Sequence, residues 1–287
     1  MTSFASPTLG PFEAVADRVF VAVAEPAAVN IGLVVGSQAA LVVDTGSSPA
    51  QGAEILASAR EMAGGVPVTH VAVTHAHFYH LFGLAAFDAL ASYGHEQLAA
   101  GLAAERPPAE QLAALGVADA DIVAPGHTFS LTAVLPLGDC HAELFHFGRG
   151  HTDHDVVVLV PERGVVFAGD LLETAAFPSV GEDSFLDEWP RTLDWTLGTL
   201  RAHTVVVPGH GPTLGQDAAL LQQTQLAWLE THAGRLWEAG TRVEDAWGTS
   251  EQWSLPREAA EAALRVRFAQ YAAEGRPRTR SLPLLGR

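Results

Sequence analysis

The chain has 287 residues, of which 48% are hydrophobic, and its formal net charge is −17. A chain of this length and composition can bury a large core within one α/β domain, and no apolar run approaches the roughly 20 residues that cross a bilayer. The acidic balance argues against nucleic-acid and anionic-membrane partners, because proteins that bind either present a basic face. All 16 basic residues are arginine, which excludes Schiff-base and P-loop chemistry that depends on lysine.

Cysteine and histidine usage narrow the chemistry further. Cys140 is the only cysteine, which excludes an internal disulfide and a thiolate zinc cluster. The first ten residues show no basic patch followed by an apolar stretch, so we expect no signal peptide and a cytoplasmic protein. The 13 histidines are the compositional feature that indicates a function.

The N-terminal part is typical of strands followed by a helix. Gly36-Ser37-Gln38 separates two short apolar runs, which indicates a hairpin, and Pro49 directly after Ser48 indicates a capped helix start. The predicted elements are strands over 18–23, 31–35 and 40–43, a helix over 49–63 and a strand over 68–74.

The middle and C-terminal parts mix helices and strands. Residues 95–115 are typical of a helix that is interrupted at Pro107-Pro108. Apolar periodicity and glycine or proline breaks predict the later elements. These are strands over 142–147, 155–160 and 165–168, a helix over 186–200, a strand over 204–207, and helices over 217–239 and 257–271. We expect Trp228 and Trp237 to pack the last two helices onto the body.

Histidines and one aspartate follow the predicted strand ends. Directly after the strand over 68–74 comes His75-Ala76-His77-Phe78-Tyr79-His80. In an extended segment, residues i and i+2 point the same way, so His75 and His77 can bind one ion. His80 lies about one turn further and can face a second ion.

Two further groups follow later strands. His151 lies in Gly150-His151-Thr152, and the pair Asp170 and His210 lies in Gly169-Asp170 and Gly209-His210-Gly211. The glycines let the backbone turn sharply and approach an ion. Imidazole nitrogens with a carboxylate are the ligand set that zinc prefers and that non-haem iron also uses. The sequence therefore predicts a metal site.

The order of these motifs, with Asp44-Thr45-Gly46 before them, resembles that of the metallo-β-lactamase superfamily over roughly residues 19–212. Five separated motifs in the right order make the resemblance specific. It implies a four-layer αβ/βα sandwich with additional C-terminal helices and with metals at one edge between the sheets. We expect one metallo-β-lactamase-fold domain over 1–287, with a core of about 12–215 and a C-terminal helical extension of about 216–287.

The resemblance also implies a role for each matched residue. The expected ligands are His75, His77 and His151 for a first metal, His80 and His210 for a second, and Asp170 bridging the two. Asp44 is expected to support the ligands, and Asp170 and Tyr79 are the candidate catalytic residues. The expected cofactor is zinc, as one or two ions, with iron as the alternative. A metal-bound water would ionise near neutral pH and attack an acyl carbonyl.

The chain departs from the family at Tyr79, where the superfamily usually has an aspartate that ligates the second metal. A phenol with an ordinary pKa of about 10 is a poor zinc ligand. Three readings follow. The second site is empty or weak and the enzyme is mononuclear, or Tyr79 binds as phenolate and favours iron, or Tyr79 donates a hydrogen bond to substrate. We favour the first.

The other histidines are interpreted as structural or supporting residues. His154 follows the third histidine motif closely and is expected to face solvent or to support a ligand. The remaining histidines are expected to be structural, and they are His70, His95, His127, His141, His146, His203 and His232. A Ser–His–Asp hydrolase is a poor alternative, because the chain has no G-x-S-x-G elbow.

The working hypothesis is hydrolysis of an ester, thioester, lactone or amide of a small molecule by a metal-activated water. Three alternatives stay open: a mononuclear iron persulfide-dioxygenase-like enzyme, a catalytically decayed ligand-binding protein, and a polyketide thioesterase-cyclase. For the last, the aromatic residues between Phe177 and Trp189 could wall an apolar pocket, by analogy only. We expect a small-molecule substrate, no nucleic-acid or membrane partner, and C-terminal helices that could pair two subunits as a homodimer.

Overall fold

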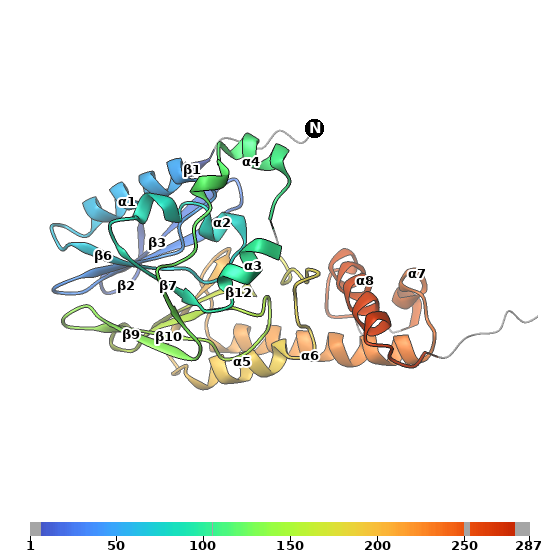
Figure 1. The fold of residues 1–287 in the computed structure, drawn as a ribbon. Helices are drawn as coiled ribbons and strands as arrows, with labels where there is room; N and C mark the ends of the chain where they lie inside the picture. The colour runs from blue at the N-terminus through green and yellow to red at the C-terminus, as the bar shows by residue number, and fades with distance from the viewer. Residues whose placement is uncertain (1–6, 105, 250–252, 279–287) are drawn as a thin grey trace, which may run out of the picture.

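Two β-sheets packed face to face, with helices on their outer sides, form the body of the computed structural model (Figure 1). The structure describes residues 7–104, 106–249 and 253–278. Helix α1 (Pro49–Met62) lies on one outer side, and helices α5 (Trp189–Gly198) and α6 (Gln216–Glu238) lie on the other. This is the four-layer αβ/βα sandwich that the motif order implies.

The strands of the N-terminal half place two functional segments at the same edge. They are β1 (Thr8–Leu9), β2 (Glu13–Ala16), β3 (Val19–Glu25), β4 (Val29–Val35), β5 (Ala40–Val43), β6 (Val68–Ala72), β7 (Ala91–His95) and β8 (His127–Phe129). Strands β3 to β5 pair antiparallel, with the predicted hairpin at residues 36–38, and β5 to β8 pair in parallel. Because β5 and β6 are parallel neighbours, Asp44 and His75 leave the sheet at the same end.

The helices of this half cover the outer face of its sheet, except the one that contains Gly101, which lies against His154. They are α1, α2 (Phe78–Leu81), α3 (Leu98–Ala104) and α4 (Ala109–Leu115), with 3-10 turns at Leu84–Phe87 and Asp119–Asp121. Helix α1 begins as the sequence predicts, since Gln51 N donates to Ser48 Oγ at 3.3 Å and Pro49 lies in the first turn. Its residues Ile55 and Ala59, one turn apart, are buried against the sheet.

The C-terminal half begins as an antiparallel meander and ends with a parallel strand. Its strands are β9 (Thr132–Pro136), β10 (His141–Phe145), β11 (Val157–Val160), β12 (Val165–Glu173) and β13 (Val205–His210), with a 3-10 turn at Pro161–Arg163. Strand β13 pairs in parallel with β12, and one residue pair, Val29 with His210, joins it to β4 of the other half. The end of β13 therefore lies at the junction of the two halves.

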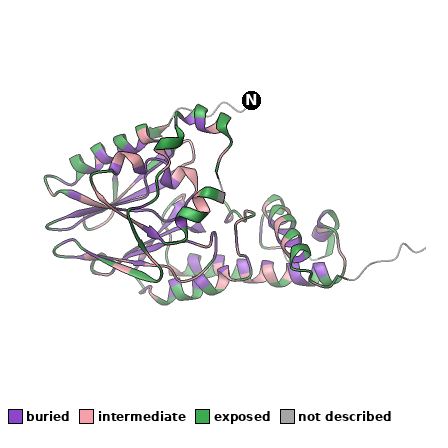
Figure 2. Ribbon diagram, viewed as in Figure 1, coloured by how far each residue is buried: buried purple, intermediate pink, exposed green. Residues whose placement is uncertain are grey.

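Three apolar layers hold the sandwich together, and the strands are largely buried (Figure 2). One layer lies beneath α1 and includes Ile55, and another lies beneath α5 and α6 and includes Trp189. The third lies between the sheets, where Leu41 of β5 and Phe167 of β12 are buried together. Burying each large apolar side chain contributes about 1.5–3 kcal/mol, so these layers fix the two halves against each other.

The C-terminal helices continue beyond the sandwich (Figure 1). Helix α7 (Val243–Ala246), a 3-10 turn at Trp247–Thr249 and helix α8 (Arg257–Ala273) pack on the far part of α6. The buried Arg267 of α8 donates to both carboxylate oxygens of Glu230 at 2.8 and 3.1 Å. Tyr271 Oη donates to the same carboxylate at 2.7 Å, and Trp237 is buried against Phe268. These contacts fix α8 on α6, and Trp237 packs these two helices against each other.

Most of the predicted elements form close to their expected positions, but the helix expected from residue 95 is wrong at its start. His95 ends β7, where its ring stacks on His146 at a centroid distance of 3.9 Å, and the helix begins only at Leu98. Strand β12 runs to Glu173, beyond the expected end at residue 168. Among the described residues, no helix combines the length and the apolar character that crossing a membrane requires.

Candidate metal centre

Six side chains from both halves meet at one edge of the sandwich. They are His75, His77 and His80 between β6 and the end of α2, His151 after β10, Asp170 in β12 and His210 at the end of β13. They form two clusters that share Asp170, and in each cluster the candidate ligand atoms lie within 4.8 Å of one another. The structure therefore brings together all six residues that the sequence predicts as ligands.

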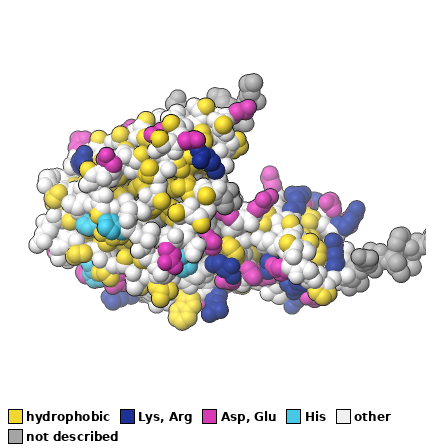
Figure 3. Space-filling model, viewed as in Figure 1, with side chains coloured by type: hydrophobic (Ala, Val, Ile, Leu, Met, Phe, Trp, Pro, Cys, Tyr) yellow, Lys and Arg dark blue, Asp and Glu magenta, His cyan; other side chains and the backbone are white. Residues whose placement is uncertain are grey.

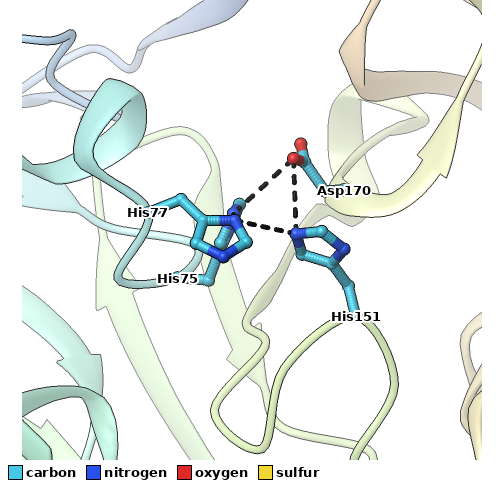
Figure 4. Close-up of side chains that lie close together, drawn as sticks. All are labelled: His75, His77, His151 and Asp170. Atoms are coloured by element: carbon cyan, nitrogen blue, oxygen red, sulfur yellow. Dashed lines mark hydrogen bonds and ion pairs between the residues drawn. The ribbon is translucent and has the colours of Figure 1, made fainter. Parts of the chain in front are cut away.

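The first cluster contains His75, His77, His151 and Asp170 (Figure 4). His77 Nδ1 lies 3.0 Å from His75 Nε2 and 2.9 Å from His151 Nε2. Asp170 Oδ2 lies 3.6 Å from His75 Nε2 and 3.5 Å from His151 Nε2. Zinc–nitrogen bonds of about 2.0–2.1 Å in a tetrahedral site place the ligand atoms roughly 3.3 Å apart. The four atoms therefore have the spacing that a zinc ion needs.

His75 and His77 reach this cluster in a different way from the one that the sequence argument assumed. Strand β6 ends at Ala72, so the two histidines follow an irregular segment. Their rings stand at 81° and present different nitrogens, Nε2 from His75 and Nδ1 from His77. His75 and His77 do face the same cluster, as their i and i+2 spacing predicts. They reach it from an irregular segment after β6 and not from an extended strand.

The second cluster contains His80, Asp170 and His210. His80 Nε2 lies 3.1 Å from Asp170 Oδ1, and His210 Nε2 lies 3.4 Å from Asp170 Oδ2. Although His80 Nε2 and Asp170 Oδ1 are close, they lack hydrogen-bond geometry, and both are buried without another partner. Buried polar atoms without partners are costly, and a cation beside them would satisfy both.

All five histidines have an acceptor at the ring nitrogen that faces away from the clusters. The pairs are His75 Nδ1 with Thr74 Oγ1 at 3.1 Å, His77 Nε2 with Asp183 Oδ2 at 3.1 Å, His80 Nδ1 with Asp44 Oδ2 at 2.7 Å, His151 Nδ1 with Ser179 O at 3.3 Å, and His210 Nδ1 with Ala27 O at 2.9 Å. A neutral imidazole that donates from its outer nitrogen has a bare lone pair on the inner one. Five lone pairs and a carboxylate converging on one place fit a bound metal ion.

The charges at the centre are set by burial and by Asp170. Burial lowers the pKa of His75 well below its ordinary value and that of His151 to about 4, so both rings are neutral. Burial alone would also lower the pKa of His80, but Asp170 and Asp44 outweigh it and raise the pKa to about 10, so without a cation the inner nitrogen of this ring carries a proton that a bound metal ion would replace. Burial would raise the pKa of Asp170, but His80 and His75 hold it well below its usual range. Asp170 is therefore ionised and available to a cation.

Tyr79 lies at the rim between the two clusters. Its hydroxyl is 3.3 Å from His77 Nδ1 and donates to Asp170 Oδ2 at 3.4 Å. Burial, together with the negative charge of Asp170, raises the pKa of the Tyr79 phenol. The phenol therefore stays protonated and acts as a donor, and it does not supply the carboxylate that the superfamily usually has at this position.

Two backbone features hold the ligands in place. Asp44 has a φ of 65°, which is uncommon for a residue other than glycine, and its carboxylate accepts from Thr74 N at 2.8 Å and from His80 Nδ1 at 2.7 Å. Gly209 lies so close to Asp170 that a Cβ there would be 1.7 Å from Oδ1. The strained Asp44 links β5 to the His75–His80 segment, and the absent side chain at Gly209 makes room for Asp170.

Sequence reasoning missed some of the residues that surround the ligands. Asp183, next to His77, and Ser179, next to His151, lie in a loop without a motif, so no local pattern indicates them. His154, expected to face solvent or to support a ligand, is buried, and its Nε2 accepts from Ala76 N at 3.0 Å between two ligands. Trp189, at the end of the aromatic segment that one alternative offered as a pocket wall, is fully buried in the core, where its indole donates to Leu171 O.

The family assignment rests on most of the chain and not only on this site. The model of the metallo-beta-lactamase superfamily matches residues 24–218. The chain belongs to the metallo-beta-lactamase superfamily. The match includes all six clustered residues and ends just after the start of α6, so α7 and α8 lie outside it.

Relatives and solved structures agree with this assignment. Type 2 metallo-beta-lactamases from Bacillus sp. (strain 170) and Bacillus cereus are 28% and 29% identical over 161 and 162 residues, which is 55% of this chain and 57% of each relative. The matched region thus spans little more than half of those proteins. A metallo-beta-lactamase from Pontibacter korlensis superposes with a TM-score of 0.61 at 22% identity, covering 76% of this chain and 99% of that one.

A second solved structure shares the fold. The metallo-beta-lactamase FIM-1 from Pseudomonas aeruginosa, in its mono-zinc form, superposes with a TM-score of 0.62 at 22% identity, over 80% of this chain and 98% of that one. At this level of identity the likeness establishes the shared fold alone.

Proposed function

We propose that this chain is a hydrolase that uses a metal ion, with zinc expected, to cleave an ester, thioester, lactone or amide bond of a small molecule. One observation carries the proposal: the inner nitrogens of five histidines converge on Asp170 while every outer nitrogen is paired. Such an arrangement directs the inner ring nitrogens at one place that suits a cation, which would replace any proton they carry.

In this proposal the first cluster holds the ion firmly and the second holds one weakly. The first cluster offers three nitrogens and a carboxylate, which complete a four-ligand set. The second offers only His80, Asp170 and His210, because Tyr79 stands where the superfamily usually has a further carboxylate. We therefore propose a mononuclear enzyme.

The protein's own groups would divide the remaining tasks. Bound zinc would supply Lewis acidity and lower the pKa of a water to about 7. Asp170 is negatively charged at the junction of the clusters, where its carboxylate can accept a hydrogen bond from a protonated group. The Tyr79 hydroxyl lies within hydrogen-bond reach of that junction and can donate to an oxygen of the substrate.

The surroundings of the centre are consistent with a small-molecule substrate. A cavity of about 350 Å³, within the range of small-molecule sites, opens beside Asp183 and is lined by Gly101, Asp153 and Phe185 among others.

On the face shown in Figure 3, arginines around the C-terminal helices lie among acidic side chains. Arg265 pairs with Glu261, for example, so that surface is not a basic patch of the kind that nucleic acids need.

Metal analysis and a substrate panel test this proposal together. We expect purified wild-type protein to carry about one ion per chain and, with zinc, to hydrolyse at least one of a panel of generic esters, thioesters, lactones and β-lactams. His77→Ala should lose most of the metal and the activity, whereas His127→Ala, an exposed histidine stacked on Tyr93, should lose neither.

Other outcomes would point elsewhere. Full metal content in His77→Ala would contradict the ligand assignment. Inertness of zinc-loaded wild-type protein across the whole panel would favour a ligand-binding protein. Iron in the purified protein, with oxidation of a persulfide, would favour the dioxygenase.

A further inference from the structure

The loop between β12 and α5, residues 174–188, contacts two of the three histidines of the first cluster. Asp183 Oδ2 lies 3.1 Å from His77 Nε2, and Ser179 O lies 3.3 Å from His151 Nδ1. Ser184 Oγ also donates to the backbone oxygen of His151 at 2.8 Å. The loop thus holds the outer sides of His77 and His151, while His75 is held by its neighbour Thr74.

Asp183 controls which nitrogen of His77 faces the cluster. The His77 ring can flip by rotation about its side-chain bond, and the flip that aims Nδ1 inward is the one that brings Nε2 to Asp183. A carboxylate acceptor fixes the proton on Nε2 and leaves the lone pair on Nδ1. His77 is the partly exposed member of the first cluster, so packing alone constrains its ring less than those of His75 and His151.

The C-terminal helix α8 reaches the same loop. Gln270 Nε2 donates to Ser184 O at 2.8 Å, and Ser184 directly follows Asp183. The loop is also tied to the His151 segment, because Phe185 N donates to Gly150 O at 2.8 Å. Helix α8 is in turn fixed on α6 by the buried pair of Arg267 with Glu230. A continuous set of contacts therefore leads from the C-terminal helices to His77.

We propose that Asp183 is a positioning residue for His77, and that α8, through Gln270, holds the loop that carries Asp183. The C-terminal extension, which lies outside the superfamily match, is then a structural part of the metal centre. This inference rests on the metal centre of the proposed function, and it assigns a role to residues that the ligand motifs do not include.

The test measures zinc affinity and not activity. Zinc is titrated into metal-free protein in competition with a chromogenic chelator, and the visible spectrum of the cobalt-substituted protein reports the ligand geometry. The variants are Asp183→Ala, Asp183→Asn and Gln270→Ala. Gln225→Ala is the matched control, because Gln225 Nε2 makes the same type of bond, to Ser254 O at 3.0 Å, away from the loop.

We expect Asp183→Ala to weaken zinc binding about 10- to 100-fold and to change the cobalt spectrum. Asp183→Asn keeps an oxygen acceptor for His77 and should recover part of the loss. Loss of the single neutral hydrogen bond in Gln270→Ala should weaken binding roughly three- to tenfold, and Gln225→Ala should bind as the wild type does.

The outcomes separate this inference from the proposed function. Zinc binding by Asp183→Ala within twofold of the wild type would overturn the role of Asp183, and equal affinities of Gln270→Ala and Gln225→Ala would overturn the role of α8. If Asp183→Ala does not fold, as judged by circular dichroism, Asp183→Asn and Gln270→Ala carry the test. A wild type that binds no zinc would instead overturn the metal centre itself.

Discussion

Replacing Gly209 by alanine tests the geometry of the metal centre with one methyl group. A Cβ at this position would lie 1.7 Å from Asp170 Oδ1 and 2.9 Å from the backbone carbon of Gly169. Contacts below 3.0 Å are essentially never seen for a Cβ. Asp170 Oδ1 must therefore move by about 1.3 Å, whereas metal–ligand distances tolerate about 0.2 Å.

The magnitude follows from the loss of Asp170 as a ligand. Changes in residues that merely support metal ligands cost about 10- to 100-fold in affinity, so a displaced ligand should cost at least about 100-fold. Zinc at 100 times the wild-type Kd adds about 2.7 kcal/mol to the free energy of unfolding. Losing that contribution should reduce the zinc-induced rise in Tm by roughly 4–5 °C, because the unfolding entropy of a chain of this size is about 0.6 kcal/mol/K.

The assay is thermal unfolding of the variant with and without zinc, together with elemental analysis. Gly215→Ala is the matched control, because a Cβ there meets nothing within 4 Å and the φ of −97° suits alanine. The metal-free Gly209→Ala protein should lose only about 1–3 kcal/mol from the added volume. Wild-type zinc content and a wild-type zinc-induced Tm shift in Gly209→Ala would refute the reasoning.

Two further predictions concern Tyr79 and His95. Tyr79→Asp supplies the missing carboxylate and should raise the metal content toward two ions per chain by elemental analysis, while Tyr79→Phe should not; an unchanged count in Tyr79→Asp would contradict the mononuclear explanation. Burial, with the neighbouring His146, lowers the pKa of His95 to about 4, so between pH 6.5 and 4 the unfolded state binds more protons than the folded state. The free energy of unfolding should therefore fall as the pH drops through this window, and urea unfolding of His95→Gln should show a smaller fall; an identical pH dependence would show that His95 does not contribute.

The six clustered residues could be predicted because each lies in a short, recognisable segment in or directly after a strand. His75, His77 and His80 lie within six positions, and His151, Asp170 and His210 each have a glycine beside them. Parallel and adjacent strands bring such ends to one edge, so the motif order is enough to predict that they meet. The hairpin around residues 36–38 and the cap of α1 by Ser48 were predictable for the same reason, since local chemistry determines them.

The supporting residues could not be predicted, because their contacts depend on the tertiary fold. Asp183 lies 106 positions from His77 in the chain. No sequence spacing indicates that the loop that contains Asp183 will meet the His77 ring of the other half. The end of β7 at His95 was missed because a stacking contact with His146, from a distant loop, outweighs the local helical preference of the sequence. Gln270 on α8 looks like any solvent-facing polar residue until the loop at residue 184 is placed against it.

The ligand partners also show how a bound ion would join the two halves of the sandwich. His75, His77 and His80 come from the N-terminal half, and His151, Asp170 and His210 come from the C-terminal half. Two of the hydrogen bonds that the outer ring nitrogens make also cross between the halves, from His77 to Asp183 and from His210 to Ala27. The backbone ladder crosses there at a single pair, Val29 with His210. A cation at this edge would therefore bind atoms of both halves, so we expect zinc to stabilise their packing as well as the site.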